Sequence, residues 1–396
     1  MRSSTTQGRG RQRAGAVAIA AVIGLGAVVL PAAAEAKPQK VKVMTRNLYL
    51  GADLTSALLA PNQVELFERA FKVTDNVRET NFTARSRKLA DEIQATKPDL
   101  IGLQEVALWR RGPIGVFDGP QTPAEEVVYD FLDELTNQIE NRGLDYKVAV
   151  VQEETDFEVP IDDVDDDQLG DGGNPSNMRD ARLTMRDVIL VKKGVKIKNT
   201  ASDQYDVALP IDLAPDSPPG MPGPEDIIAP RGYTYADVLV GGKRRGEEFR
   251  FINTHLEAFS AFIRNAQASE LVNSTDATDT NKPVVLLGDL NSDPDDPSIS
   301  PSPPEPIATA NAAAFNTIAS AGFVDRGTTE NTCCHDADLL NAATAFSSRI
   351  DHVLTNDPDN VLGLSADLIG DDPAMKTPSG LWPSDHGGVV AKLRIK

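Results

Sequence analysis

The chain has 396 residues, of which 40% are hydrophobic and 25% are charged, and 59 acidic residues against 39 basic ones give a formal net charge of -20. This composition excludes a disordered tail, a collagen-like fibre and a polytopic membrane protein. The charge also excludes bulk attraction to a polyanion, because phosphate groups are repelled at long range. If the protein acts on phosphate groups, a bound cation must supply the attraction.

The first 36 residues have the pattern of a secretory signal peptide. Several arginines precede an uncharged run from Ala14 to Leu30, and Ala34-Glu35-Ala36 fits the A-x-A cleavage pattern. An uncleaved anchor is the alternative, since about 17 to 20 apolar residues can span a bilayer. We expect cleavage and a secreted, more acidic protein with no later membrane span. No feature of the sequence indicates a protein partner.

After the leader, strand-like runs alternate with helical ones. Apolar runs predict strands at 41–50, 100–106, 146–151, 188–191, 233–240, 249–255, 284–290, 349–355 and 389–395. Composition and spacing predict helices at 64–96, 123–142, 258–272 and 311–321. No linker divides residues 37–396 into two self-sufficient sets of elements, so we expect one elaborated α/β domain.

Three stretches between these elements are expected to be loop insertions. Residues 161–177 are acidic and Gly-rich, whereas 209–230 and 292–306 are Pro-rich and are predicted to continue neither strands nor helices. Clustered carboxylates suit a hard cation, so Ca²⁺ at the acidic loop is one interpretation. Its spacing does not match an EF-hand loop, and a solvated loop is the alternative.

The two cysteines of the chain, Cys333 and Cys334, are adjacent. Consecutive Cα atoms lie about 3.8 Å apart, below the usual range of about 4.4 to 6.8 Å for a disulfide, so a mutual bridge would be strained. A vicinal bridge in an oxidising compartment and packed or intermolecular thiols both remain open. The sequence contains neither a disulfide framework nor a CxxC zinc pattern.

Polar residues that can do chemistry lie at or just past several of the apolar runs that predict strands. They are Asn47, Glu105, His255, Asp289, Asn291, Asp351, Asp385 and His386. One such residue alone would be an ordinary strand-to-turn residue. Because α/β proteins assemble sites where strand ends converge, the repetition indicates a functional site at one edge of a sheet.

Seven short motifs occur in a fixed order along the chain: TRNLYLG, LQEV, RDVILV, NTHLE, GDLNS, RIDHVL and SDHGGV. In this order they resemble the endonuclease/exonuclease/phosphatase superfamily of DNase I-like fold, most closely secreted bacterial members of unassigned substrate. The resemblance runs from Val41 to the C-terminus. It implies an α/β (α+β) fold, a four-layer sandwich of two packed, mainly antiparallel sheets flanked by helices.

The resemblance also implies a divalent-metal site. Glu105 is similar to the principal metal carboxylate of the family, and Asn47 to the Asn that supports the metal by hydrogen bonding or ligation. Asp385 resembles the acidic partner on the far side of the site. Oxygen ligands of this kind suit Mg²⁺, with Mn²⁺ as a substitute, so one cation would face a phosphoryl oxygen.

The remaining motif residues resemble the groups that carry out in-line attack on phosphorus. Asp289 matches the Asp that orients or deprotonates water, and Asn291 can donate to a phosphate oxygen. Asp351 resembles the carboxylate that orients His386, and we assign proton transfer to Asp289 and His386 together. His255 matches a second His that stabilises the transition state or protonates the leaving oxygen.

Other candidates are weaker. Arg186 and Asp187 precede a predicted strand and either line the site or form a surface ion pair. His335 and His352 are interpreted as structural. The basic turn at 243–245 can touch nucleic acid or be solvated.

The substrate is where the prediction is least specific. We expect a secreted, metal-dependent phosphodiesterase, with a nuclease ahead of a sphingomyelinase or phospholipase C-like enzyme and of a phosphomonoesterase. The substrate would be a nucleic acid or a phospholipid headgroup. With 2 Trp, 6 Tyr and 13 Phe, the chain has no aromatic-rich hairpin for membrane entry, although 112–117 is mildly apolar. A non-catalytic binding module on the same scaffold is the alternative of another class.

Overall fold

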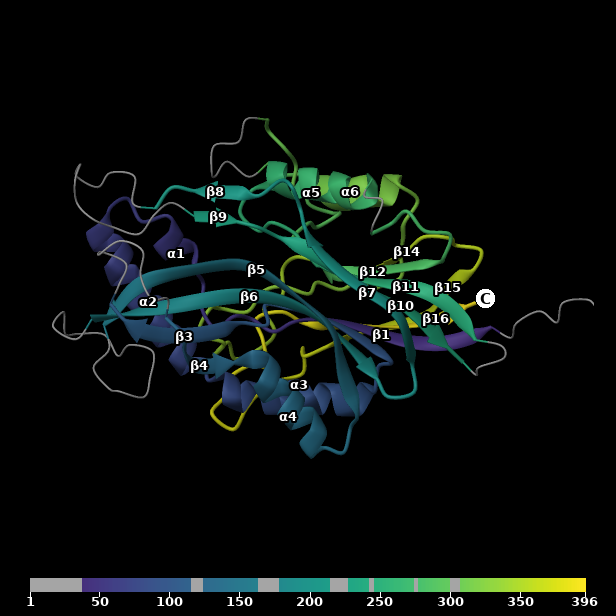
Figure 1. Ribbon diagram of the computed structural model, residues 1–396, viewed down its shortest axis with the longest axis horizontal. Coiled ribbons are helices and arrows are strands. Elements are labelled where there is room, and N and C mark those ends of the chain that lie inside the picture. Colours follow the sequence, from purple (N-terminus) through teal and green to yellow (C-terminus); the bar gives the residue numbers. More distant parts are fainter. Residues whose placement is uncertain are drawn as a thin grey trace, which may run out of the picture. The chain divides into compact units, whose positions relative to one another are not determined.

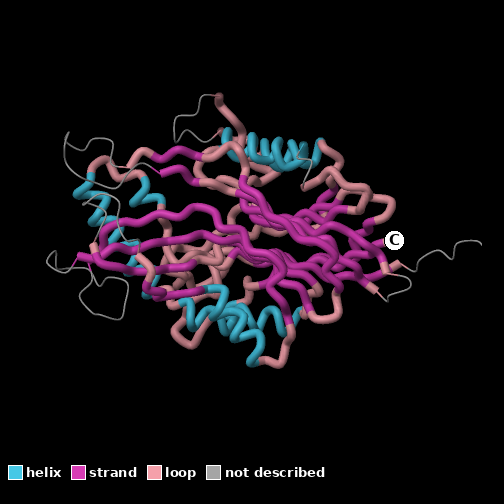
Figure 2. The backbone as a smooth tube through the Cα atoms, in the orientation of Figure 1, coloured by secondary structure: helices cyan, strands magenta, loops and turns pink. Residues whose placement is uncertain are grey.

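The computed structural model describes residues 38–114, 124–162, 178–213, 227–241, 246–273, 277–299 and 307–396. These residues form two β-sheets that pack face to face, and helices cover the outer face of each sheet (Figure 1, Figure 2). The four-layer α/β sandwich predicted from the sequence is therefore confirmed. The predicted signal peptide, residues 1–36, lies outside the described residues.

The first sheet has the strand order β15-β16-β1-β2-β6-β3-β4, and β5 pairs with β6. Its strands are β1 Gln39–Asn47, β2 Leu100–Gln104, β3 Leu108–Pro113, β4 Glu126–Asp130, β5 Tyr146–Asp162, β6 Met178–Lys192, β15 Val361–Ile369 and β16 Gly388–Ile395. All of these neighbours pair antiparallel except β1 and β2, which run parallel.

The second sheet has the order β13-β14-β12-β11-β10-β7. Its strands are β7 Lys196–Gln204, β10 Gly232–Val240, β11 Glu247–His255, β12 Val284–Asp289, β13 Val324–Asp325 and β14 Asp351–Thr355. Here β11 and β12 form the parallel pair. A separate two-stranded ribbon joins β8 Leu209–Ile211 to β9 Ile227–Ala229.

Helices divide between the two outer faces. They are α1 Thr55–Leu58, α2 Gln63–Glu79, α3 Phe82–Thr96, α4 Phe131–Asn141, α5 Ala261–Asn273 and α6 Ala313–Ser320, with a short 3₁₀ turn at Pro373–Met375. Apolar side chains of α2, α3 and α4 pack on the first sheet, and those of α5 and α6 pack on the second (Figure 1). Among the helices of the described residues, none is long and apolar enough to cross a bilayer.

The strand β12 shows why the central strands read as continuous apolar runs. Val285 and Leu287 point into the core between the two sheets, whereas Val284 and Leu286 point into the core beneath α5 and α6. Because side chains alternate along a strand, a strand covered on both faces is apolar at every position. The same run ends at Asp289, so the first polar side chain of the strand lies at the edge of the sheet.

Several boundaries differ from the prediction. The helix predicted over 64–96 is two helices, because Asn81 adopts a left-handed conformation between them and its side chain caps α3 at Ala84. In 123–142 the strand β4 precedes α4, whose first turn is capped by Asp130. Propensity does not reveal either break, since both depend on pairing and capping partners.

The Pro-rich segment 209–230 was predicted to contain no strands, and this is wrong at both ends. Pro210 lies within β8, opposite Ile228 of β9. A two-stranded ribbon tolerates proline because each strand has a free edge where no N–H donor is needed. Residues 214–226 between the two strands lie outside the described part of the chain.

Candidate active site

Three site residues of the second sheet lie in one row across neighbouring strands. His255 of β11 is level with Asp289 of β12, which in turn is level with Asp351 of β14. Gly288 makes this approach possible: its φ is +148°, and a Cβ atom there would lie 1.8 Å from the carbonyl oxygen of Thr254. The register of the sheet therefore brings the predicted base and its neighbours together.

The first sheet supplies Asn47 and Glu105 to the same edge. Asn47 ends β1 level with Gln104 of β2, so Glu105 follows directly beside it. The Asn47 amide nitrogen donates to Glu105 Oε1 and to Asp289 Oδ2, both at 3.1 Å. Its Oδ1 accepts the N–H of Tyr49 at 2.9 Å. Asn47 thus joins carboxylates of the two sheets by hydrogen bonding, the first of its two predicted roles.

Two of these polar residues occupy a backbone conformation that is rare outside glycine. Glu105 has φ +54° and Asn291 has φ +49°. Such conformations cost about 1 to 3 kcal/mol each and persist only where neighbours hold them. Here Glu105 Oε2 accepts the N–H of Leu50 at 2.8 Å, and the Asn291 N–H donates to Asp289 Oδ1 at 2.9 Å. The two turns are therefore fixed by the site's own carboxylates.

Asp351 and His386 form a buried pair. His386 Nδ1 lies 2.8 Å from Asp351 Oδ2, and His386 Nε2 lies 3.7 Å from Asp289 Oδ2. Burial alone lowers the pKa of His386, but the carboxylates of Asp351, Asp385 and Asp289 outweigh it and hold that pKa well above its ordinary value. Burial raises the pKa of Asp289 to about 7, although His386 opposes this. The protonated ring of His386 therefore lies between the carboxylate of Asp351 and Asp289, whose carboxyl group has a pKa of about 7.

His255 lies on the other side of Asp289. Its Nε2 is 3.5 Å from Asp289 Oδ2 and 3.1 Å from Asn291 Nδ2, and its Nδ1 is 3.1 Å from an amino nitrogen of Arg231. Burial and the charge of Arg231 hold the pKa of His255 well below its ordinary value. Since a guanidinium can only donate, Nδ1 accepts and the neutral ring carries its proton on Nε2. The acceptor beside Nε2 is Asp289 Oδ2, because the Asn291 amide nitrogen is itself a donor.

Arg231 belongs to a buried charge cluster that the sequence did not reveal. It lies 3.3 Å from Glu154 Oε2 and 3.9 Å from Glu257 Oε2. Ligand atoms of Glu154, Asp187 and His255 also lie within 4.8 Å of one another. Glu257 stands in the NTHLE motif, and Arg231 lies two residues before the predicted strand 233–240. Their positions in the sequence are therefore the signal that could have identified them. Glu154 has none, because it lies in the polar second half of β5.

The side chains of Asp187 and Arg186 lie on opposite faces of the first sheet, because successive side chains alternate along β6. The Asp187 carboxylate is fully buried beside Glu154 and forms no hydrogen bond within the described residues. Burial and the Glu154 charge raise the pKa of Asp187 well above its ordinary value. Arg186 instead donates to the Val106 carbonyl and pairs with Asp130 at 2.6 Å. It holds the turn after Glu105, so the ion-pair alternative describes it better than a substrate contact.

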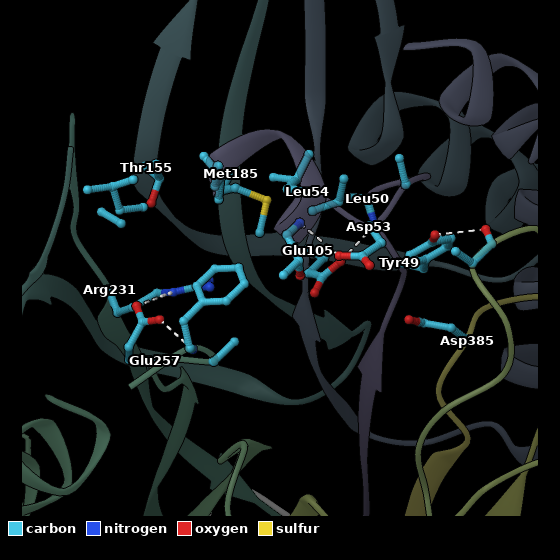
Figure 3. A pocket seen from close by; sticks show the side chains of 18 of the residues that line it. Tyr49, Leu50, Asp53, Leu54, Glu105, Thr155, Met185, Arg231, Glu257 and Asp385 are labelled. Carbon is cyan, nitrogen blue, oxygen red and sulfur yellow. Dashed lines mark hydrogen bonds and ion pairs between the residues drawn. The ribbon is translucent and has the colours of Figure 1, made fainter. Parts of the chain in front are cut away.

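Glu105 and Asp385 face the same pocket, and they provide the donor chemistry that a hard divalent cation requires. Figure 3 shows Glu105 between Asp385 and the Arg231–Glu257 pair. Burial raises the pKa of Asp385 to about 6, and the Glu105 charge adds to this while His386 opposes it. Two carboxylates that disfavour each other's charge are relieved by a cation between them. The predicted metal residues therefore fit Mg²⁺ or Mn²⁺.

The vicinal cysteines lie against His386, which forms the buried pair with Asp351. The structure joins Cys333 and Cys334 in a disulfide, one of the two arrangements left open by the sequence. Cys333 Sγ lies 3.6 Å from His386 Nε2, and Cys333 forms isolated β-bridges to Ser348 and His386. The segment around the disulfide therefore forms one wall of the site.

The other two histidines have structural surroundings. His335 stacks on Trp382, with ring centroids 4.2 Å apart, and its pKa is lowered to about 4, chiefly by burial. His352 Nε2 lies 3.1 Å from the Ser292 carbonyl and Nδ1 lies 3.5 Å from Asp325. Two further candidates cannot be placed: the basic turn 243–245 and residues 163–177 of the acidic loop lie outside the described residues.

Comparison with known proteins adds a family and a fold. The profile of the Endonuclease/Exonuclease/phosphatase family matches residues 74–386. No curated protein sequence matches the chain. A solved structure of an endonuclease/exonuclease/phosphatase family protein from Bacteroides thetaiotaomicron has a TM-score of 0.50 and 16% identity, covering 91% of this chain and 99% of its own.

Two further solved structures have lower TM-scores. A mannosyl-6-phosphatase from Bacteroides thetaiotaomicron has a TM-score of 0.46 and 16% identity, and the match covers 89% of this chain and 99% of that one. D. rerio TDP2 complexed with a single strand DNA product has a TM-score of 0.44 and 15% identity, covering 90% and 99%. At such identities the likeness is one of fold alone.

Proposed function

The chain belongs to the endonuclease/exonuclease/phosphatase family and is a metal-dependent phosphoester hydrolase, and we propose that it is a phosphodiesterase that uses in-line attack of water on phosphorus. The observation that carries the proposal is the row formed by His255, Asp289 and Asp351, closed by the hydrogen bond that His386 Nδ1 donates to Asp351. This arrangement places a proton acceptor beside hydrogen-bond donors at one sheet edge, as hydrolysis of a phosphoester requires.

Glu105 and Asp385 would hold the divalent cation, which we propose to be Mg²⁺ with Mn²⁺ as a substitute. When bound, the cation neutralises charge on a phosphoryl oxygen as a Lewis acid. Asn47 orients Glu105 from one side and the Leu50 N–H holds it from the other. The protein therefore fixes this carboxylate before any ligand arrives.

Asp289 is the group best suited to accept the proton of the attacking water. A general base works best when its pKa lies near the working pH, and burial raises that of Asp289 to about 7. His386, held protonated by Asp351, cannot accept a proton at that pH. It instead donates from Nε2 toward the site and balances the charge that forms on phosphate.

His255 and Asn291 would hold the non-bridging phosphate oxygens. Arg231 occupies Nδ1 of His255, so the ring presents its Nε2 proton to the site as a neutral donor. Two hydrogen bonds fix Asn291. Its backbone N–H donates to Asp289, and its side-chain amide donates to the Leu256 carbonyl at 3.0 Å. Both donors are thus oriented in advance, which is how such sites stabilise charge that develops during reaction.

The charge around the site favours a diester over a monoester. Among the described residues that line the pocket, Asp53, Glu105, Glu257 and Asp385 are acidic and Arg231 is the basic one. Arg231 is already paired with carboxylates. A phosphodiester carries one negative charge and a monoester carries two, so the surrounding carboxylates repel the diester less. A nucleic-acid strand is our first candidate substrate and a phospholipid headgroup the second.

The test is hydrolysis of bis-p-nitrophenyl phosphate, DNA, RNA and sphingomyelin by the purified protein, with Mg²⁺ or Mn²⁺ and with EDTA as control. We expect cleavage of at least one of these diesters, lost in EDTA and in His386→Asn. His352→Asn is the matched control, because that buried histidine faces Ser292 and Asp325 away from the site. Failure to cleave any of the four would refute the proposal.

A non-catalytic binding module is the competing explanation, and metal binding separates it. We expect Mg²⁺ to raise the melting temperature of the wild type, and Glu105→Gln to lose both this shift and hydrolysis. A shift without hydrolysis would support the binding module instead.

Export is a further part of the proposal, based on residues 1–36. N-terminal sequencing of protein recovered from the culture medium tests it, with Lys37 as the expected first residue.

A further inference from the structure

A pocket of about 370 Å³ lies beside Glu105 and Asp385 (Figure 3). Pockets that bind small molecules usually have about 300 to 1,000 Å³. Besides Glu105 and Asp385, five segments line it: residues 49–58, the paired strands β5 and β6, the ribbon β8–β9 with Arg231 after it, residues 257–259, and residues 334–337. Metal binding and proton transfer use only Glu105 and Asp385 of this lining, so most of the pocket has no role in the mechanism.

The walls of the pocket are mainly apolar. Leu54 comes from the segment before α1, Phe157 from β5 and Met185 from β6. Ile211 and Ile227 come from the ribbon, which belongs to neither main sheet. The Pro-rich segment 209–230 therefore contributes a wall that the catalytic residues do not need. An apolar wall binds apolar groups by removing them from water.

The charges in the pocket disfavour a second anionic group. Glu105 and Asp385 occupy one side, and a cation between them would be used by the reacting phosphate. At the other side Arg231 lies 3.3 Å from Glu154 and 3.9 Å from Glu257, so two carboxylates balance its charge. A neighbouring phosphate of a long nucleic acid would thus find no unpaired cation among the described residues of the lining.

We propose that this pocket binds an uncharged, mainly apolar alcohol group of about one ring in size, esterified to the phosphate that the site hydrolyses. The inference rests on the proposed function and names the substrate class: a small or terminal phosphodiester with an aryl or short alkyl ester group. Ile211 and Ile227 of the ribbon determine this specificity. A pocket of about 370 Å³ is too small to hold two long acyl chains.

The experiment measures dissociation constants by isothermal titration calorimetry with the purified protein in Mg²⁺. The ligands are methyl phosphate, phenyl phosphate and 4-carboxyphenyl phosphate, the monoesters that remain when a phosphodiesterase removes the other alcohol of such a diester. We expect phenyl phosphate to bind about tenfold or more tightly than methyl phosphate, because a ring is buried. The added carboxylate of 4-carboxyphenyl phosphate should abolish this advantage, since the lining is acidic.

Neighbouring residues of β9 provide a matched pair of variants. Ile227 lines the pocket, whereas Ile228 is 61% exposed and does not. In Ile227→Trp the indole fills the pocket, so the ratio of the phenyl and methyl dissociation constants should approach one. Ile228→Trp adds the same side chain to the same strand and should keep the wild-type ratio.

Three results would overturn the inference: equal affinities for the two esters, a ratio unchanged in Ile227→Trp, or the same loss in Ile228→Trp. Failure of the proposed function looks different. If the protein prefers phenyl phosphate but hydrolyses none of the four diesters, the inference about the pocket stands and the proposed reaction is wrong. If the protein hydrolyses bis-p-nitrophenyl phosphate but binds phenyl and methyl phosphate equally, the proposed reaction stands and the inference about the pocket is wrong.

Discussion

At the scale of single residues, the site works through carboxyl groups whose surroundings differ. Burial raises the pKa of Asp289 to about 7 and that of Asp385 to about 6. Asp351 and Asp187 are buried as deeply, but Asp351 binds His386 while Asp187 forms no hydrogen bond within the described residues. Three roles follow from these surroundings: a proton acceptor, a partner for a charged ring and a carboxyl group held neutral.

Asp351→Asn should lower kcat for bis-p-nitrophenyl phosphate by about 10²- to 10⁴-fold. The amide cannot hold His386 in its protonated form, so the ring loses its charge and its orientation. Metal-dependent thermal stabilisation should remain, because Glu105 and Asp385 are intact. Steady-state kinetics and melting curves with Mg²⁺ measure the two effects. An unchanged kcat would remove Asp351 from the mechanism.

Asp187→Asn should stabilise the protein at pH 8 and have little effect at pH 4. The folded pKa of Asp187 lies above the unfolded one, so its favourable contribution is complete below the unfolded pKa and is lost as the pH rises through the folded pKa. An amide escapes this loss. We expect a gain in melting temperature of about 2 °C or more at pH 8 in EDTA.

Asp367→Asn on β15 is the control for this effect, because Asp367 is exposed. Its melting temperature should follow the wild type at both pH values. If Asp187→Asn instead lowers the melting temperature at pH 8, the carboxylate is charged and stabilising there. A bound cation, or Arg231, would then be its partner.

Single residues at strand ends could be predicted from the sequence, and the buried cluster behind them could not. Glu105 and Asp289 stand at the end of an apolar run and Asp351 stands at the start of one, so their position was visible. Glu154 lies in the polar stretch QEETDFEV, which is a strand because its residues pair with β6, from Gln152 opposite Asp187 to Val159 opposite Ala181. Opposite charges across that pair, such as Asp156 and Arg182, replace the apolar pattern that prediction relies on.

At the scale of elements, α3 holds the segments that carry the metal residues. Arg85 of α3 is fully buried and donates to the carbonyls of Thr80, Leu48, Tyr49 and Pro383 at 2.7 to 3.0 Å. The segment with Leu48 and Tyr49 continues to Leu50, whose N–H binds Glu105, and the segment with Pro383 continues to Asp385. The position of the helix was predictable from its spacing. The role of Arg85 was not, because its partners lie at both ends of the chain.

Arg85→Met should lower the free energy of unfolding by about 3 kcal/mol or more, since several hydrogen bonds to a charged group are lost in the interior. It should also weaken binding of Mg²⁺, because the segments around Glu105 and Asp385 lose their common support. Urea unfolding and calorimetric metal titration measure these changes. The control is Arg69→Met on α2, a part-exposed residue that pairs with Glu65 and should change stability by less than about 1 kcal/mol.

At the scale of the whole molecule, a net charge of -20 opposes any approach to a polyanion. The repulsion extends over about 30 Å at 10 mM salt and about 8 Å at 150 mM. The proposed metal site would act only at short range, once a phosphate has reached the cation that Glu105 and Asp385 would hold. The order of the layers and the two sheets were predictable at this scale, because the motifs fix the sequence of strands.

For a DNA oligonucleotide, kcat/KM should therefore rise several-fold when NaCl increases from about 10 to 150 mM. Screening removes the repulsion and leaves the metal contact in place. A basic nuclease would show the opposite trend. Bis-p-nitrophenyl phosphate is the control, since its single charge makes it nearly insensitive to salt. A fall with salt would mean that a local basic surface outweighs the net charge.

The pairing of β1 has a consequence for the order in which the protein is made. β1 lies between β2 and β16, so one of the first strands of the described chain pairs with the last, Gln39 opposite Ile395. Asp385 and His386 enter the site with that last strand. A growing chain therefore has neither a complete site nor the β1–β16 pair until residues 385–395 have been made. Activity should arise only after that point, and a chain that stops short of residue 385 should have none.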